Sequence, residues 1–218
     1  MNPIISLSIN EKKYKKNQVS ILKNFKLDVE EGEQIAIIGR SGIGKSSLLN
    51  IIGLLDDDFD GDYYLFGKNV EGLSDAQKAG LRNKNIGFVL QDSALIDSLT
   101  VEENIKLPFL YSKEKDLSQF QNDFEEIVDS IGIKDILKKK PVNCSGGERS
   151  RAVFARGIIM KPDIILADEP TASLDDENKK KIIELLFDLH KEQNTTILLV
   201  THDKEIAEMF PGIIKIGD

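Results

Sequence analysis

Apolar residues along this chain gather in short continuous runs, and stretches with helical spacing separate these runs. Continuous apolar runs are typical of strands buried on both faces of a parallel sheet. Their alternation with helical stretches predicts an α/β fold in which helices cover both faces of the sheet. The runs are Ile35–Ile38, Ile86–Leu90, Ile164–Ala167 and Thr196–Val200.

The beginning of the chain follows a different pattern. Ile4–Ile9 alternates apolar and polar residues, and Val19–Val29 is rich in residues that favour strands. Both patterns predict strands of an antiparallel flank, joined by the polar turn Glu11–Gln18. We expect further short strands at Tyr63–Phe66 and Ile213–Ile216.

The middle of the chain is predicted to be helical. Thr100, followed three residues later by a glutamate, forms a capping box that begins a helix, and we expect Pro108 to interrupt this helix. Apolar residues of Phe120–Ile131 recur at helical spacing, and Ile133–Lys140 is expected to form a second short helix.

These patterns predict one domain over residues 1–218. Its core comprises residues 1–91 and 145–218, and residues 92–144 form an α-helical subdomain inserted into it. The core helices are expected at Ser47–Ile52, from Ser74 or Asp75 to Leu81, at Arg149–Met160, and from Asp175 or Asp176 onward.

A glycine-rich loop joins the first apolar run to the first helix and has the form G-x-x-x-x-G-K-S, the phosphate-binding loop of nucleoside triphosphatases. Its backbone N–H groups and the helix N-terminus favour bound anions. Lys45 is expected to contact the outer phosphates, and the Ser46 hydroxyl to ligate Mg²⁺. The residues of the loop are Gly39, Arg40, Ser41, Gly42, Ile43, Gly44, Lys45 and Ser46, followed by Ser47.

An acidic pair, Asp168 and Glu169, follows the third apolar run. Together with the phosphate loop, this position predicts that Asp168 holds Mg²⁺ and that Glu169 is the general base that polarises the attacking water. The alternative is an acidic turn after a strand. Because parallel strands gather ligand groups at their carboxyl ends, we expect Lys45, Gln91, Asp168 and His202 at one edge of the sheet.

A second small-residue segment, Ser145-Gly146-Gly147, precedes the helix that carries Arg149 and Arg151. It is either a second anion site or an ordinary capped helix start. One nucleotide cannot easily use two such sites within one compact domain. A symmetric dimer, in which unlike loops share each nucleotide, resolves this difficulty.

Composition narrows the function classes. The 218 residues include 37 acidic and 29 basic side chains, a net charge of −8, so a nucleic-acid partner is not expected. The single cysteine, Cys144, excludes an internal disulfide and fits a reducing compartment. No apolar stretch reaches ~18 residues, and the N-terminus lacks a secretory signal pattern. We therefore expect a cytoplasmic protein that meets a membrane only through a partner.

Taken in order, these motifs resemble the nucleotide-binding domain of ATP-binding-cassette (ABC) transporters over essentially the whole chain. The resemblance implies a P-loop NTPase of the ABC-ATPase type: a RecA-like core with a mixed sheet, an antiparallel β flank and an α-helical subdomain, using ATP and Mg²⁺. The matching motifs are the phosphate loop Gly39–Ser46, the Q-loop Gln91, the signature Cys144–Glu148, the Walker B strand Ile164–Asp168 with Glu169, the D-loop Ala172–Asp175, and the switch His202.

The resemblance also assigns roles to single residues. Tyr14 is expected to stack on the adenine, Gln91 to contact Mg²⁺ and the attacking water, and His202 to hydrogen-bond the γ-phosphate. In a homodimer with ATP sandwiched at the interface, the second subunit would contribute Ser145, Gly146, Gly147 and Glu148 to each nucleotide.

Three positions depart from the family pattern. The signature usually has the form Leu-Ser-Gly-Gly-Gln, and Cys144 and Glu148 replace its first and last residues. We expect Cys144 to be a packing residue, whereas the effect of the Glu148 charge on dimer closure stays open. Ser47 replaces the usual threonine, a mild change.

Finer features, Leu49–Asp56 and Leu81–Gln91, resemble the branch of macrolide exporters, lipoprotein-releasing ATPases and bacteriocin exporters. This implies an ATPase at the inner face of the membrane that powers export or membrane extraction of a peptide, lipid-linked or drug-like substrate through a separate transmembrane permease. The alternative is the ATPase of a non-transporting complex, such as a regulator of wall hydrolases in cell division. Soluble cassettes of DNA repair or translation fit less well, because this chain has one cassette and a short insert.

Overall fold

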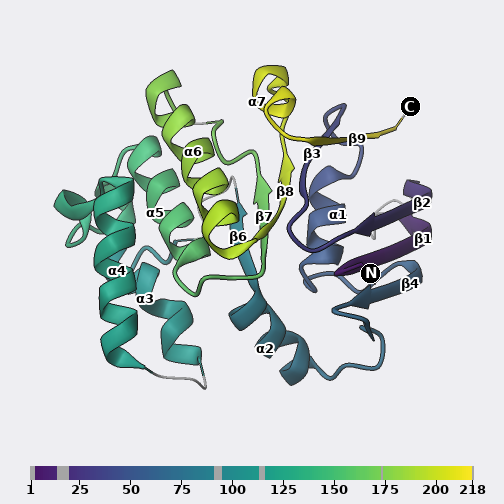
Figure 1. The fold of residues 1–218 in the computed structure, drawn as a ribbon, viewed down its shortest axis with the longest axis horizontal. Coiled ribbons are helices and arrows are strands. Elements are labelled where there is room, and N and C mark those ends of the chain that lie inside the picture. The colour runs from purple at the N-terminus through teal and green to yellow at the C-terminus, as the bar shows by residue number, and fades with distance from the viewer. Residues whose placement is uncertain (1–2, 14–19, 91–94, 113–115, 173, 218) are drawn as a thin grey trace.

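A parallel sheet forms the centre of the molecule (Figure 1). The computed structural model describes residues 3–13, 20–90, 95–112, 116–172 and 174–217. The parallel sheet has the strand order β6-β7-β8-β3-β9. Its strands are β3 (Gln34–Gly39), β6 (Ile86–Leu90), β7 (Ile164–Asp168), β8 (Thr196–Val200) and β9 (Gly212–Ile216). All the predicted apolar runs therefore form strands, and the last predicted strand joins the sheet beside β3.

The antiparallel flank forms a second sheet, with the strand order β2-β1-β4-β5. Its strands are β1 (Ile5–Lys13), β2 (Ser20–Val29), β4 (Asp60–Leu65) and β5 (Lys68–Asn69). Strand β1 continues beyond the predicted end at Ile9, because residues as far as Lys13 pair with β2. The predicted α/β class, with parallel and antiparallel strands, is confirmed, and the two kinds of strand are divided between two sheets.

Helices pack around the parallel sheet. The α-helices are α1 (Lys45–Ile52), α2 (Asp75–Asn85), α3 (Val101–Tyr111), α4 (Leu117–Ile131), α5 (Gly146–Ile158), α6 (Asp176–Gln193) and α7 (Lys204–Glu208). In Figure 1, α1 lies between the two sheets, whereas α3, α4, α5 and α6 gather on the opposite side of the parallel sheet.

The alternation of side chains along each strand divides the core into two clusters. Ile164 and Leu166 of β7 face the cluster that also holds α1 and the antiparallel sheet. Ile165 and Ala167 face the cluster shared with α3, α4, α5 and α6. Because successive residues of a strand point to opposite faces, a strand covered on both sides must be apolar throughout. This explains the continuous runs in the sequence.

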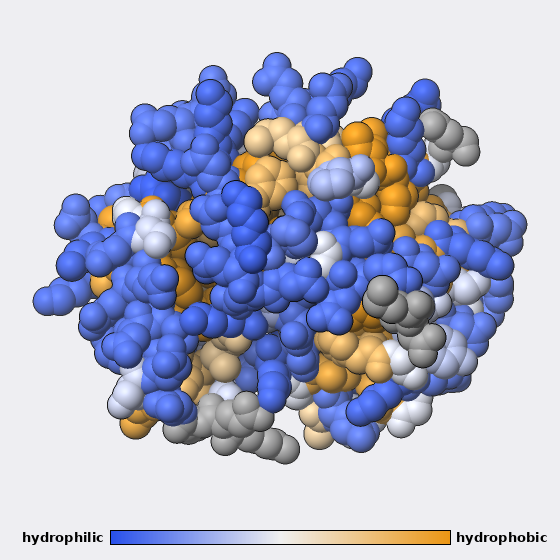
Figure 2. All heavy atoms as spheres, viewed as in Figure 1, coloured by the Kyte–Doolittle hydropathy of each residue, from blue (hydrophilic) through white to orange (hydrophobic). Residues whose placement is uncertain are grey.

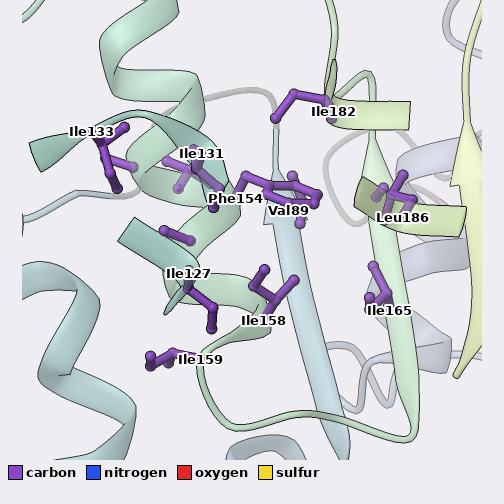
Figure 3. Packing of buried hydrophobic residues seen from close by; sticks show 14 of the residues in the cluster. Val89, Ile127, Ile131, Ile133, Phe154, Ile158, Ile159, Ile165, Ile182 and Leu186 are labelled. Atoms are coloured by element: carbon purple, nitrogen blue, oxygen red, sulfur yellow. The ribbon is translucent and has the colours of Figure 1, made fainter. Parts of the chain in front are cut away.

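Phe154 links the helices to the sheet in the second cluster. Figure 3 shows its ring between Val89 of β6 and Ile131 of α4, with Ile182 and Leu186 of α6 farther along the same core. Its side chain is only 1% exposed. The buried stripe of α4, predicted from the helical spacing of Phe120–Ile131, packs into this cluster.

The expected break at Pro108 is wrong, because α3 runs through this residue to Tyr111. Proline removes one intrahelical hydrogen bond, at a cost of about 3 kcal/mol or more. Burial of a large apolar side chain contributes about 1.5–3 kcal/mol. Phe109, directly after the proline, is buried and stacks on Phe120 with ring centroids 3.9 Å apart. Tertiary packing therefore favours continuation of the helix.

Other predicted boundaries also differ. The segment Ile133–Lys140 is not one short α-helix; it contains a 3₁₀ turn, η1 (Lys134–Ile136), and a second turn, η2 (Pro141–Asn143), follows. Helix α2 continues past Leu81 to Asn85. Helix α5 begins at Gly146, inside the predicted signature segment, because Ser145 caps it.

The outer surface is mostly polar, and Figure 2 shows hydrophilic side chains over most of the displayed face, with apolar atoms visible between them. Large exposed apolar side chains gather where α3 ends and α4 begins: Leu110, Tyr111 and Leu117. Within the described ranges, none of the helices combines the length and the apolar character needed to cross a membrane.

Candidate functional site

A polar hollow of about 180 Å³ lies where the loop after β3 meets the end of β7. Both strands pair with β8 in parallel register, so their carboxyl ends reach the same edge of the sheet. The structure therefore brings the predicted phosphate loop and the predicted acidic pair together. The residues bordering the hollow are Ser41, Gly42, Gly44, Lys45, Ser46, Ser47, Asp168 and Glu169.

The loop backbone is shaped for an anion. Gly42 and Gly44 have φ angles of 78° and 106°, in the left-handed region that side chains disfavour. Gly44 is the N-cap of α1, and no side chain caps this helix or places an acidic group in its first turn. The positive end of the helix therefore faces the hollow without a competing carboxylate of its own first turn.

Lys45 lies across the loop that precedes it. Its Nζ donates hydrogen bonds to the carbonyl oxygens of Gly39 and Arg40, at 2.9 and 3.0 Å. The Arg40 side chain is exposed, and Ile43 packs against the apolar cluster that holds α1. Among the loop residues that the structure describes, Lys45 thus supplies the cationic side chain at the hollow.

Glu169 is held by the strand next to its own. Its backbone N–H donates to the Val200 carbonyl at 2.9 Å. Its carboxylate lies 2.7 Å from His202 Nδ1 and accepts a 3.5 Å hydrogen bond from the Thr201 hydroxyl. The backbone φ of Glu169 is 49°, an uncommon conformation for a residue with a side chain. Such strain persists where the surrounding structure fixes it.

The donor set at this edge suits Mg²⁺. Ser46, in the first turn of α1, supplies a hydroxyl, and Asp168 supplies a carboxylate, and both border the hollow. Mg²⁺ prefers such oxygen donors and is usually held by one or two protein ligands together with substrate phosphates. Within the described residues there is no group of three or more His, Cys, Asp or Glu side chains that could hold a metal ion. Mg²⁺ bound together with a nucleotide does not require such a group.

The segment Ser145–Glu148 does not border the hollow in the described chain. It forms a capping box: the Ser145 hydroxyl accepts from the Glu148 N–H at 3.2 Å, and Glu148 Oε2 accepts from the Ser145 N–H at 2.7 Å. Gly147 lies beside Leu174. The structure therefore shows the capped helix start, and the anion site at this segment stays a prediction.

Cys144 belongs to the core, as expected for a packing residue. It is buried, and its thiol contacts the Lys140 carbonyl oxygen at 3.5 Å. Burial is the main cause that raises the pKa of the Cys144 thiol, and the nearby Glu148 charge raises it further. The thiolate, which is the reactive form, is therefore disfavoured.

Some predicted site residues cannot be placed, and one described residue was missed. Tyr14 and Gln91 lie outside the described residues, although Leu90, which precedes Gln91, pairs with Asp168. Thr201 was not predicted to contribute, yet its hydroxyl contacts Glu169 and also accepts from the Asp203 N–H at 3.0 Å. The sequence feature that could have identified Thr201 is its position: it is a polar residue directly after an apolar run and next to the candidate histidine His202.

A glycine loop between a strand and a helix, with an acidic pair at the end of a neighbouring parallel strand, defines a nucleoside-triphosphate-binding α/β protein. The family model described as "ABC transporter" matches residues 22–172 of this chain. The chain belongs to the ABC transporter family. It is an ATP-hydrolysing cassette of the kind that uses Mg²⁺.

The chain is similar to relatives of different lengths. It is 41% identical to the macrolide export ATP-binding/permease protein MacB of Chlorobium luteolum, over 92% of this chain and 30% of that protein. It is 37% identical to the lipoprotein-releasing system ATP-binding protein LolD of Xanthomonas euvesicatoria, over 93% of this chain and 82% of that one. The dimeric structure of the ATP-binding cassette MJ0796 with ADP and Pi superposes with a TM-score of 0.90 at 36% identity, covering 97% and 94% of the two chains.

Replacing Lys45 with methionine is predicted to weaken Mg·ATP binding at least about tenfold, because a charge-assisted contact to phosphate is lost. Titration of a fluorescent ATP analogue measures this affinity. Lys26→Met, on the exposed face of β2, is the matched control and should bind as the unaltered chain does. Equal affinities for both variants would contradict a phosphate site at this hollow.

Proposed function

We propose that this chain is the ATPase subunit of a transporter that exports a peptide, lipid-linked or drug-like substrate, or extracts it from the membrane, through a separate transmembrane permease. The convergence of Lys45 and Glu169 on one hollow, in a chain of the ABC transporter family, carries this proposal. The similarity to a macrolide exporter and to a lipoprotein-releasing ATPase supports the proposed branch of exporters and membrane-extraction ATPases. The chain spans 30% of the length of that macrolide exporter.

In this proposal, each predicted site residue has a separate role in binding or hydrolysing ATP. The loop N–H groups and Lys45 bind the β- and γ-phosphates, and Ser46 and Asp168 hold Mg²⁺. The bound metal neutralises charge on the phosphate oxygens. Gln91 contacts the metal and the attacking water, and Tyr14 stacks on the adenine.

Glu169 is the proposed general base. Glu169 lines the hollow, and its carboxylate is held by contacts with Thr201 and His202. His202 uses Nδ1 toward Glu169, so Nε2 is the ring nitrogen left for a γ-phosphate oxygen. The two ring nitrogens can donate together only in the protonated imidazole. His202 would thus connect the base to the phosphate that is cleaved.

The separation of the two anion-binding segments supports a shared site. Lys45 borders the hollow, whereas Ser145–Glu148 lies at the start of α5 and does not border it in the described chain. We propose that two copies pair head to tail, so that Ser145, Gly146, Gly147 and Glu148 of one copy complete the site of the other. The dimeric arrangement of the similar cassette MJ0796 supports this pairing.

A groove of about 980 Å³ provides a place for the permease. It lies along α2, and the Asn83 side chain bonds the Pro108 carbonyl of α3 at 2.9 Å beside it. The described side chains lining it include basic groups and no acidic ones, although the chain is acidic overall. The groove therefore suits a helix with apolar and acidic side chains. The basic residues are Lys68, Arg82, Lys84 and Arg156.

In this proposal, the cassette lies at the inner face of the membrane and is attached to it only through its partner. We propose that the chain is divided into a core (residues 1–91 and 145–218) and an α-helical subdomain (residues 92–144). This division is compatible with docking in the groove, because residues of both parts line the groove. ATP-driven closure of the dimer would then move the docked permease helices, and hydrolysis would reset it.

Glu169→Gln is predicted to trap an ATP-bound dimer, because loss of a general base typically slows the reaction by about 10²- to 10⁴-fold while the amide keeps the size of the side chain. Sedimentation with Mg·ATP should show the dimer, and a phosphate-release assay the lost turnover. Glu205→Gln in α7 changes the same functional group elsewhere and should hydrolyse ATP normally. Hydrolysis by Glu169→Gln at the unaltered rate would defeat the assignment of the base.

Gly80→Trp is predicted to abolish co-purification of the permease while ATP hydrolysis by the isolated cassette is unchanged. Gly80 lines the groove, and a Cβ added there has no heavy atom within 4 Å, so we expect the indole to occupy part of the groove while α2 keeps its backbone. Asn122→Trp on exposed α4 is the matched control. Retention of the same membrane protein by Gly80→Trp would show that the permease docks elsewhere.

A further inference from the structure

The phosphate loop contains one large apolar side chain, that of Ile43. The preceding residues, Ser41 and Gly42, are exposed and border the hollow. Ile43 is half-buried, does not border the hollow in the described chain, and packs against the cluster that holds α1 and the antiparallel sheet. Its side chain therefore points from the loop into the protein and not toward a ligand.

Two glycines leave the space that Ile43 occupies. Gly39 ends β3 and pairs with Ile216 of β9, which lies beside β3 in Figure 1, and Gly217 follows β9 directly. A Cβ added at Gly39 would lie 3.2 Å from Ile43 Cγ2. A Cβ added at Gly217 would lie 2.5 Å from Ile43 Cγ1 and 2.7 Å from its Cδ1. Ile43 thus lies against the ends of two neighbouring strands, where both strands lack a side chain.

The next residue of the loop is covered from the other sheet. Gly44 is buried, and a Cβ added there would lie 3.3 Å from Cγ2 of Ile21. Ile21 belongs to β2 of the antiparallel sheet. The loop therefore contacts the parallel sheet through Ile43 and the antiparallel sheet through Gly44, directly before Lys45.

These contacts affect how well the loop is prepared for a phosphate group. A binding site gains affinity when its groups already have the bound arrangement before the ligand arrives. Glycines such as Gly42 and Gly44 have many alternative backbone conformations. A β-branched side chain is stiff about its first torsion, so packing that fixes the Ile43 side chain also restrains the backbone between these two glycines.

We propose that Ile43 is a positioning residue of the ATP site: by packing beside Gly217 at the end of β9, it holds the phosphate loop in the conformation that binds phosphate. This inference rests on the phosphate site proposed at the hollow. Ile43 need not touch the nucleotide, because it acts through the loop backbone. The packing requires that residue 217 has no side chain.

Gly217→Ala and Ile43→Ala together separate this role from a general structural one. Gly217→Ala places a methyl group where Ile43 lies, and Ile43→Ala removes the conflict. Gly217 has a φ angle of 87°, so alanine is also strained there by its backbone. This strain is the same whether residue 43 is isoleucine or alanine, and it cancels in a double-mutant cycle. The coupling between the two substitutions therefore reports the contact alone.

The cycle is measured in the full 218-residue chain, as the dissociation constant of a fluorescent ATP analogue with Mg²⁺. Gly217→Ala should raise this constant about 3- to 10-fold when residue 43 is isoleucine, within the range of couplings found for contacting residues. When residue 43 is alanine, the same substitution should change it less than about 2-fold. Ile43→Ala alone should raise it about 3- to 10-fold, the cost of ordering a mobile group on binding. KM should rise in parallel while kcat stays nearly constant, because ATP binding is weakened and the chemical step is not.

Two matched controls account for lost stability and for backbone strain. Ile214→Ala shortens a half-buried isoleucine of β9 that packs against the same cluster but lies outside the loop. Gly67→Ala introduces alanine at a φ angle of 71°, where an added Cβ has no heavy atom within 4 Å. Both variants should bind the analogue as the unaltered chain does.

The possible failures are distinguishable. Equal shifts from Gly217→Ala in both backgrounds, or a shift in neither, would overturn the role of Ile43. Equal losses of affinity in Ile43→Ala and Ile214→Ala would also overturn it, because lost packing would then be sufficient. If Lys45→Met binds the analogue as the unaltered chain does, the phosphate site itself fails, and this is seen before any change at residue 43.

Discussion

The parallel register of three neighbouring strands is the constraint on which this structure depends. Ile37 of β3 and Asp168 of β7 both pair with Val200 of β8. The loops that follow these strands must then meet at one edge, whatever their separation in the sequence. The phosphate loop, the acidic pair and the Thr201-His202 turn each follow one of these strands. The geometry of the candidate site is thus a consequence of sheet register.

A rigid frame also supports the strained parts of the site. The sheet is covered on one face by α1 and the antiparallel sheet and on the other by the helices that pack around Phe154. Close packing of this kind resists local relaxation. It lets Glu169, Gly42 and Gly44 hold left-handed backbone conformations at the hollow. The segment Ser145–Glu148, in contrast, stands at the start of α5 and does not border the hollow in the described chain.

The sequence predicted the parts of the fold that local patterns determine. Continuous apolar runs identified β6, β7 and β8, and capping residues identified the starts of α2 and α3. Prediction from the sequence failed where contacts between distant residues determine the local structure. Pro108 is tolerated because Phe109 is buried against Phe120. In Ile133–Lys140, the carbonyl oxygens of Leu137 and Lys139 accept hydrogen bonds from the first N–H groups of α3 and not from a helix of their own. The contact of Thr201 with Glu169 depends on side-chain placement, which spacing does not reveal. Roles predicted for Tyr14 and Gln91 stay predictions.

The structure of the hydrolysis-deficient chain with Mg·ATP, determined by crystallography or electron microscopy, tests the central claim most directly. The account predicts a twofold dimer with two nucleotides. Each nucleotide would have its γ-phosphate between Lys45 of one copy and Ser145–Gly147 of the other. A nucleotide bound by one copy alone, or a dimer that meets through other surfaces and leaves Ser145–Gly147 away from the phosphates, would contradict it.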